Sequence, residues 1–344
     1  MTYRPETEAD LAEILRKVQA PLEVRGGGTR AVGDIRGEVL ETRGLTGVRL
    51  YEPGAMTLVV GAGMPLAEVE ALLASEGQRL PFEPSGAAGS TIGGVVATNA
   101  SGPRRVQAGA CRDSLIGVRF VDGSGEIIKN GGRVMKNVTG YDLVKLMAGS
   151  WGTLGVLTEL SFRVLAIPQA SATVVVRCAA GEAPRVLAKA LGSPFDVCGA
   201  AWAEGRALVR VEGLSASVEY RAAQLCAILG GTVEAVDWAQ IRDLTPLSGA
   251  GDLWQFSLRP SQAADVAARL DAPLIMDWGG GRITARLAKG VDARALAAPY
   301  TGHATRLSMG AGAFEPETAP VKKLTDSLRA RFDPRGILNA GRLA

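Results

Sequence analysis

The order of apolar and polar positions predicts short strands and amphipathic helices in the first part of the chain. Residues 7–10, Thr-Glu-Ala-Asp, form a capping-box sequence, and the apolar residues after it recur every three or four positions, as on one face of a helix. Pro65 stands where a second helix can begin, and a third is expected over 137–147. Apolar runs predict strands at 22–25, 39–40, 48–50, 57–60 and 156–165, and a hairpin over 115–129.

The pattern changes after Pro168, where strands and helices begin to alternate. This alternation predicts an α+β region whose sheet is covered on one side, and no sequence repeat is visible in it. We expect strands at 173–177, 207–211, 253–258 and 282–287, and helices at 216–229, 261–270 and 317–332. The chain is therefore expected to divide into domains 1–168 and 169–305 and a C-terminal segment, 306–344.

Composition narrows the possible functions more than it defines one. The 344 residues carry a net charge of +3, which gives no case for nucleic-acid binding. The pair Arg104–Arg105 is interpreted as solvated loop charge, or else as a contact to phosphate. His303 is the single histidine, and none of the four cysteines forms a C-x-x-C pair, so no metal site is expected.

The same sequence suggests a location in the cell. The N-terminus lacks the apolar run of a signal peptide, and no stretch of roughly 18 uncharged apolar residues could span a membrane. We expect a cytoplasmic protein, with attachment to the inner membrane through a partner as the alternative.

Three glycine-rich segments are candidates for contacts with an anionic cofactor. Residues 25–29 follow a strand, 84–102 form a long segment of small residues, and 149–156 lead into the strand at 156–165. Glycine allows backbone N–H groups to approach phosphate because no Cβ intervenes, and Ser, Thr and Asn add short hydrogen-bonding groups. Each segment alone is equally compatible with an ordinary turn.

Together, and in this order, the segments resemble the FAD-binding domain of the vanillyl-alcohol oxidase / p-cresol methylhydroxylase (PCMH) superfamily. The matching text is VRGGGTR, STIGGVVATNASG, RDSLIGVRFVDGSGEII, KNVTGYDLVKLMAGSWGTLGVLTELSF and, near the C-terminus, FDPRGILNAGR. The resemblance implies an α+β fold with a two-subdomain PCMH-type FAD-binding domain, a smaller α+β cap domain and a C-terminal tail that returns to the flavin. The implied FAD contacts are Arg25, Gly26, Gly27, Gly28, Thr29, Ser90, Thr91, Ile92, Gly93, Gly94, Asn99, Ser101, Gly102, Gly152, Gly155, Val156 and Asn339.

Two departures from the superfamily pattern change what the resemblance implies. Thr29, not histidine, follows the glycines, which implies that FAD is bound non-covalently. The H-x-G-D-G-N-x-H segment of the 2-hydroxy-acid dehydrogenases is absent. With GSWGTLG in place of GSEGTLG, the chain resembles the FAD-binding E subunits of bacterial glycolate oxidases, which implies a second flavoprotein subunit and an iron–sulfur subunit as partners.

The function implied is oxidation of glycolate to glyoxylate, with electrons passing through the flavin to the iron–sulfur partner. One alternative is an accessory subunit that carries FAD without catalysing the reaction, and another is a stand-alone flavin-dependent alcohol oxidase or dehydrogenase. Arg133 and Lys136 are candidates to bind the substrate carboxylate, and Tyr141 and His303 are candidates for a general base. None of these four has motif support, and solvated or structural roles remain open for them.

Overall fold

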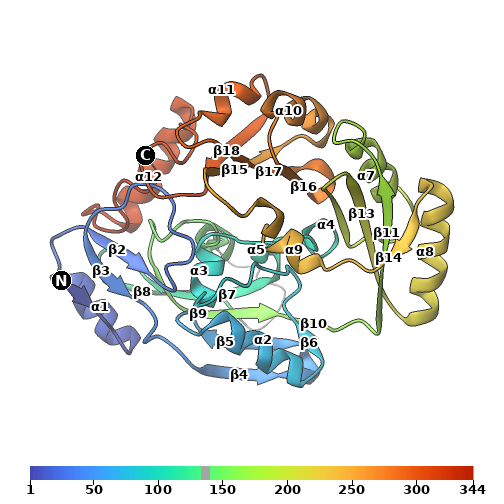
Figure 1. Ribbon diagram of the computed structural model, residues 1–344. Coiled ribbons are helices and arrows are strands. Elements are labelled where there is room, and N and C mark those ends of the chain that lie inside the picture. Colours follow the sequence, from blue (N-terminus) through green and yellow to red (C-terminus); the bar gives the residue numbers. More distant parts are fainter. Residues whose placement is uncertain (133–139, 344) are drawn as a thin grey trace. The chain divides into compact units, whose positions relative to one another are not determined.

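The computed structural model describes residues 1–132 and 140–343, which form two compact units (Figure 1). Unit 1 comprises residues 1–100, 110–167 and 309–344, and unit 2 comprises 101–109 and 168–308. The domain bounds 1–168, 169–305 and 306–344 stay a prediction. Residues 101–109 are the departure, because they interrupt unit 1 and belong to unit 2.

A small parallel sheet and helix α1 (Glu8–Lys17) open unit 1. The sheet has the order β1 (Thr2–Tyr3), β3 (Glu38–Glu41), β2 (Leu22–Arg25). The predicted capping box is confirmed: Asp10 N donates to Thr7 Oγ1 at 3.1 Å, and Thr7 N donates to Asp10 Oδ2 at 2.9 Å. Leu11 and Leu15, one turn apart on α1, are fully buried in the core of this subdomain.

A five-stranded antiparallel sheet forms the rest of the described part of unit 1. The predicted hairpin is confirmed, and its turn is held by Asp122, whose Oδ1 accepts hydrogen bonds from Ser124 N and Glu126 N, each at 2.9 Å. The strand order is β4 (Val48–Glu52), β5 (Thr57–Gly61), β9 (Val156–Arg163), β7 (Leu115–Val121), β8 (Ile127–Gly131). Short elements complete the subdomain: β6 (Gln78–Arg79) paired with β10 (Leu165–Ala166), η1 (Pro53–Ala55), α2 (Leu66–Ser75), α3 (Ile92–Ala97), α5 (Cys111–Ser114) and α6 (Leu143–Met147).

Two sequence expectations for unit 1 need adjustment. The helix expected over 137–147 is described only from Leu143 to Met147, and residues 133–139 lie outside the described part. The segment 84–102 is not a continuous loop, because it contains α3. Thr91 caps this helix by accepting a hydrogen bond from Gly94 N, and Ile92, Val95 and Val96 are fully buried. Burial of these three side chains outweighs the low helix propensity of the two glycines.

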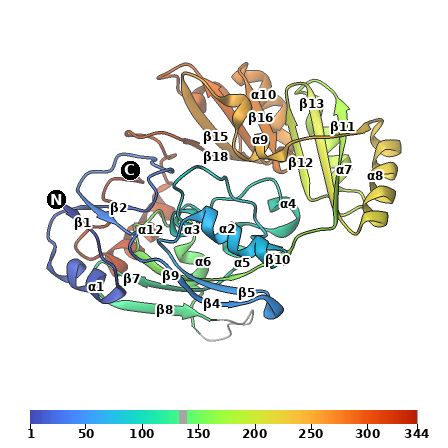
Figure 2. The same cartoon turned by 60° about the horizontal axis from the view of Figure 1, so that its bottom comes forward.

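Unit 2 is built on an eight-stranded sheet, counted over the described residues, with the order β14-β11-β13-β12-β16-β17-β15-β18 (Figure 2). The order of elements along the chain is β-α-β-β-α-β, twice. The first half is β11 (Ala170–Arg177), α7 (Ala183–Leu191), β12 (Gly199–Ala203), β13 (Arg206–Gly213), α8 (Ser215–Leu229) and β14 (Thr232–Glu234). The second is β15 (Asp252–Leu258), α10 (Ala263–Leu270), β16 (Leu274–Asp277), β17 (Arg282–Leu287), α11 (Ala293–Ala297) and β18 (Gly302–Arg306). Unit 2 therefore contains a repeated order of elements that is not visible as a repeat in the amino-acid sequence.

Helices α7, α8, α10 and α11 supply the apolar side chains that pack on one face of the unit 2 sheet. The other face is partly covered by α9 (Trp238–Arg242) and η2 (Thr245–Leu247), so the expectation of a sheet covered on one side only is incomplete. The remaining short helices of unit 2 are α4 (Arg105–Ala108), η3 (Pro260–Gln262) and η4 (Trp278–Gly280).

The C-terminal segment belongs to unit 1. Helix α12 (Ala319–Phe332) ends with the Phe332 ring 6.1 Å from that of Phe120. The chain then runs beside β2, where Leu22 N donates to Ile337 O at 2.7 Å and Asn339 N donates to Leu22 O at 2.9 Å. The expected return of this segment to the N-terminal domain is thus observed. Within the described residues, no helix has the length and apolar character needed to cross a membrane.

Candidate functional site

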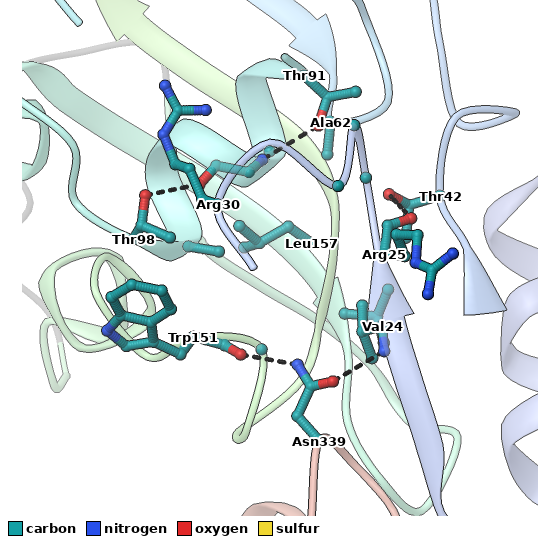
Figure 3. A pocket seen from close by; sticks show the side chains of 18 of the residues that line it. Val24, Arg25, Arg30, Thr42, Ala62, Thr91, Thr98, Trp151, Leu157 and Asn339 are labelled. Atoms are coloured by element: carbon teal, nitrogen blue, oxygen red, sulfur yellow. Dashed lines mark hydrogen bonds between the residues drawn. The ribbon is translucent and has the colours of Figure 1, made fainter. Parts of the chain in front are cut away.

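Unit 1 contains a pocket where the glycine-rich segments converge (Figure 3). Residues 23–31, the region of α3, residues 151–157 and the C-terminal residues Asn339 and Arg342 line it. Its empty volume, which includes open solvent, is about 720 Å³. Segments more than 300 residues apart in the sequence therefore share one cavity.

The first two glycine-rich segments are in direct contact, and glycine is required for that contact. A Cβ at Gly26 would lie 2.3 Å from Thr91 Oγ1, and one at Gly27 would lie 1.9 Å from the backbone oxygen of Gly89. The hydroxyl oxygens of Thr29 and Ser90 are 2.9 Å apart. The glycines thus allow two backbone segments to approach each other and form one wall of the pocket.

Asn339 connects the C-terminal segment to two other walls of the pocket. Its Nδ2 donates to Trp151 O at 2.7 Å, and its Oδ1 accepts from Val24 N at 2.8 Å, as Figure 3 shows. A Cβ at Gly152, whose φ is +69°, would lie 2.8 Å from Asn339 Nδ2. The side-chain amide is therefore already engaged by protein groups, and its role is to hold three segments together.

Arg342 is buried in the pocket and Arg30 is half-buried, and neither forms an ion pair with a carboxylate among the described residues. The charge of Glu23 nevertheless acts on Arg342 and partly offsets the effect of its burial. Arg30 donates to Ser85 O at 3.0 Å and to the hydroxyl of Ser90, and Arg342 donates to Trp151 O at 3.3 Å. Burial lowers the pKa of Arg30, and it lowers the pKa of Arg342 to about 10. The Nε–H group of Arg342 is buried and donates to no acceptor among the described residues. Buried cations of this kind are stabilised when an anion binds beside them.

These features fit a dinucleotide with a pyrophosphate. The glycine segments permit close approach of backbone to ligand, and the hydroxyls of Thr29, Thr91 and Thr98 can form hydrogen bonds with it. The guanidinium groups of Arg30 and Arg342 can pair with the negative charge of a phosphate. FAD carries a pyrophosphate, so the residues present suit the cofactor that the resemblance implies.

The structure brings most of the expected cofactor residues into this pocket. The following line it: Arg25, Gly26, Gly27, Gly28, Thr29, Thr91, Gly93, Gly94, Gly152, Gly155, Val156 and Asn339. Ser90 lies just behind the wall, Ile92 is fully buried in the core, and Asn99 Oδ1 accepts from Arg112 N at 3.0 Å. Ser101 and Gly102 belong to unit 2, where their carbonyl oxygens accept hydrogen bonds from Arg282 and Trp278.

Several lining residues were not foreseen from the sequence. Arg30 and Arg342 are the important ones, and both lie within the quoted motifs VRGGGTR and NAGR. An arginine beside a glycine-rich segment was the available signal for them. The other additions are Glu23, Val24, Ala31, Thr42, Ala62, Ala97, Thr98, Trp151 and Leu157.

Two of the four catalytic candidates lie in the described structure, and neither of these two lines the pocket. Arg133 and Lys136 lie outside the described residues. Tyr141 is 88% exposed and does not line the pocket, and His303 is exposed on β18 of unit 2, opposite Ser257. Glu23 is the one carboxylate among the described lining residues, and it is paired with Arg25 at 2.7 Å. The described lining residues thus suit cofactor binding but include no evident general base.

Comparison with known proteins agrees with this description of the pocket. Residues 1–131 match the family model described as an FAD binding domain. Over 334 residues the chain is 37% identical to glycolate oxidase subunit GlcE of Escherichia coli, an alignment that covers 94% of this chain and 93% of that protein. The confirmed cofactor class is FAD.

Other relatives match only part of the chain or only the fold. A mitochondrial D-lactate dehydrogenase (cytochrome) of Arabidopsis thaliana is 32% identical over 182 residues, which cover 50% of this chain and 31% of that enzyme. The solved structure of an alkyldihydroxyacetonephosphate synthase covers 98% of this chain, and the chain covers 76% of it, with a TM-score of 0.72 at 17% identity. The expected α+β, PCMH-type architecture is confirmed.

Proposed function

The chain belongs to the family of glycolate oxidase subunit GlcE, and we propose that it is the FAD-binding subunit of a complex that oxidises glycolate to glyoxylate. The pocket of unit 1 carries the proposal: its glycine segments are in contact, and the buried Arg342 and half-buried Arg30 form no ion pair with a carboxylate in the described structure. FAD, when bound, supplies the capacity to accept two electrons from the carbon that bears the substrate hydroxyl.

Each part of the pocket has a distinct task in this proposal. Arg30 and Arg342 neutralise the pyrophosphate, and the backbone of residues 25–29 and the start of α3 provide close hydrogen-bonding groups. Asn339 does not bind the cofactor directly but keeps the C-terminal segment closed on the pocket through Val24 and Trp151. FAD is held non-covalently, since no histidine lines the described pocket.

The partners are a second flavoprotein subunit and an iron–sulfur subunit. Oxidation of an alcohol carbon requires removal of the hydroxyl proton, and a positioned base contributes typically 10²–10⁴-fold. The described lining residues offer no free base, which favours a chain that is active only in a complex. The same observation supports the second candidate, an accessory subunit that carries FAD while the partner flavoprotein performs the oxidation.

Cofactor binding is tested on the full chain. Acid precipitation of the yellow protein should release all FAD into the supernatant, whereas flavin retained on the polypeptide would contradict non-covalent binding. Arg342→Met and Arg30→Met should each weaken FAD binding roughly tenfold to a hundredfold, since a hydrogen bond to a charged group contributes about 1.5–3 kcal/mol. Arg36→Met, in an exposed pair with Asp34, is the matched control and should leave the FAD dissociation constant unchanged.

Activity is tested by anaerobic mixing of the FAD-loaded chain with millimolar glycolate or D-lactate, alone and co-purified with the two partner subunits. We expect slow or no loss of flavin absorbance for the single chain and rapid loss for the complex. Loss by the single chain at roughly 1 s⁻¹ or faster would show that the chain is a complete enzyme and refute the need for partners. A reduced partner flavin beside an unreduced one in this chain would favour the accessory role.

A further inference from the structure

The segment Ser101–Gly109 links the cofactor pocket to unit 2 through the covalent chain. Thr91, Gly93, Gly94, Ala97 and Thr98 line the pocket in unit 1, and three residues after Thr98 the chain already belongs to unit 2. The chain returns to unit 1 at Ala110. Because one residue spans at most about 3.6 Å, the position of Ser101 restricts where Thr98 can lie.

Trp278 and Arg282 hold the first two residues of this segment within unit 2. Trp278 Nε1 donates to Gly102 O at 3.0 Å, and Arg282 Nη1 donates to Ser101 O at 3.0 Å. The indole lies between two guanidinium groups, with those of Arg105 and Arg282 at 4.2 and 4.3 Å from the ring centroid. Arg282 is itself fixed by Asp277, which is 2.5 Å away and fully buried. Cation–π contacts that are shielded from water contribute about 2 kcal/mol or more.

Arg104 provides a second attachment. Both of its terminal nitrogens contact the carboxylate of Glu212 on β13, with Nη2 2.6 Å from Oε1, and both side chains are largely buried. Gln107 Nε2 donates to Asp196 Oδ2 at 2.7 Å. The interpretation of Arg104 as solvated loop charge is therefore wrong, because a bidentate, buried pair replaces its hydration.

Backbone strain accompanies these contacts. Trp278 has φ +54°, in the left-handed region that bulky residues seldom adopt. Such a conformation is retained only when surrounding contacts impose it, and it is found preferentially where a protein positions functional groups. Asn99, at the other side of Ala100, also has positive φ, +49°, and its side chain binds the backbone of Arg112 in unit 1.

We propose that Trp278, Arg282 and Arg104 are positioning residues for the cofactor site. They bind the segment Ser101–Gly109 and so hold the pocket residues that precede it in a geometry competent to bind FAD. The inference rests on the proposed placement of FAD in the pocket of unit 1. None of the three residues needs to touch the cofactor. Their effect reaches it through the short covalent connection from Ser101 to Thr98.

The test uses the full-length chain stripped of flavin and measures the FAD dissociation constant by fluorescence titration. Trp278→Ala and Arg104→Gln should each weaken FAD binding about tenfold or more, which corresponds to the loss of one interaction with a charged group. They should also shift the bound flavin absorbance spectrum. Trp278→Phe keeps a ring between the two arginines and should recover most of the affinity.

Leu225→Ala is the matched control for loss of stability. Leu225 is fully buried in unit 2, in an apolar core cluster that includes none of Trp278, Arg282 and Arg104, so the substitution should destabilise unit 2 by about 2–5 kcal/mol and leave FAD affinity within twofold of wild type. The inference is overturned if Trp278→Ala and Arg104→Gln both bind FAD within twofold of the wild-type affinity. It is also overturned if Leu225→Ala loses as much FAD affinity as these two variants. A wild-type chain that binds no FAD overturns the proposed function itself, and the inference with it.

Discussion

The two halves of unit 2, residues 170–234 and 252–306, share the order β-α-β-β-α-β but differ in their central hairpins. In the first half Ala203 pairs with Arg206, and a two-residue turn, Glu204-Gly205, joins the strands. In the second half Asp277 pairs with Arg282, and four residues, Trp278 to Gly281, form the connection. Two additional residues thus distinguish a simple turn from the hairpin that holds Ser101–Gly109.

The chemistry at the two hairpins differs as much as their length. Glu204 and Gly205 both have positive φ and are exposed, as expected for the tight turn of a regular hairpin. In the longer hairpin, Gly279 and Gly280 are buried, and Asp277 and Arg282 form a buried ion pair. The hairpin of the first half therefore only connects two strands, whereas the equivalent hairpin of the second half also binds the segment Ser101–Gly109.

The largest expected effect comes from making the second hairpin like the first. Replacing Trp278–Gly281 with a two-residue Asn-Gly turn removes the indole and its two stacked arginine contacts. We expect amides of residues 101–109 to exchange with solvent at least a hundredfold faster and purified protein to lose most of its flavin. The matched control, Glu204-Gly205 changed to Asn-Gly, should alter neither the amide exchange of residues 101–109 nor the flavin content. Unchanged exchange in the variant that lacks Trp278–Gly281 would contradict our account of the second hairpin.

Loss of the ion pair should have the next largest effect. Arg282→Met removes the guanidinium that lies 2.5 Å from the buried carboxylate of Asp277, and should lower the free energy of unfolding of unit 2 by about 3–5 kcal/mol in a urea titration. Arg206→Met is the equivalent change in the first half, where the ion pair with Glu204 is 3.7 Å long and exposed, and should change it by less than about 1 kcal/mol. Equal effects would show that the second pair is not buried in solution.

Alanine at the two turn glycines separates backbone strain from packing. Gly205→Ala should cost about 1–2 kcal/mol, because φ is +76° and a Cβ there would meet no described atom within 4 Å. Gly279→Ala has the same strain at φ +67°, and its Cβ would lie 2.3 Å from Leu191 Cδ1. Leu191 is exposed and its Cδ1 is the end of a flexible side chain that can move aside, so thermal unfolding of this variant should occur at about the same temperature as that of Gly205→Ala. A clearly lower temperature would show that Leu191 is held in place.

The smallest effect is expected for Glu204→Gln. The carboxylate lies 3.7 Å from Arg206 and is well exposed, so solvent screens the interaction. The free energy of unfolding should change by about 0.5 kcal/mol or less in the same urea titration. A larger loss would mean that the first hairpin, like the second, depends on its charges.

Much of the fold could be predicted from local pattern. Strands such as 22–25 and 282–287 were expected at the bounds that the structure has, because apolar runs and turn residues are local signals. The glycine segments indicated where backbone would approach a ligand. The repeat in unit 2 could not be predicted, since topology repeats without repetition of sequence.

For the candidate site, the residue types were determined by the sequence and their tasks by the tertiary structure. Gly26, Gly27 and Thr29 were assigned to the cofactor site from local composition together with the resemblance. Asn339, in contrast, joins Trp151 to Val24, which is 315 residues away in the sequence. Arg30 and Arg342 were not singled out from the sequence, because the desolvation that lowers their pKa values arises only when distant segments pack around them. Ser101 and Gly102 belong to unit 2 because Arg282 and Trp278 hold them there. Local spacing records which groups a chain carries, but desolvation and partner choice depend on contacts between distant segments, which exist only after folding.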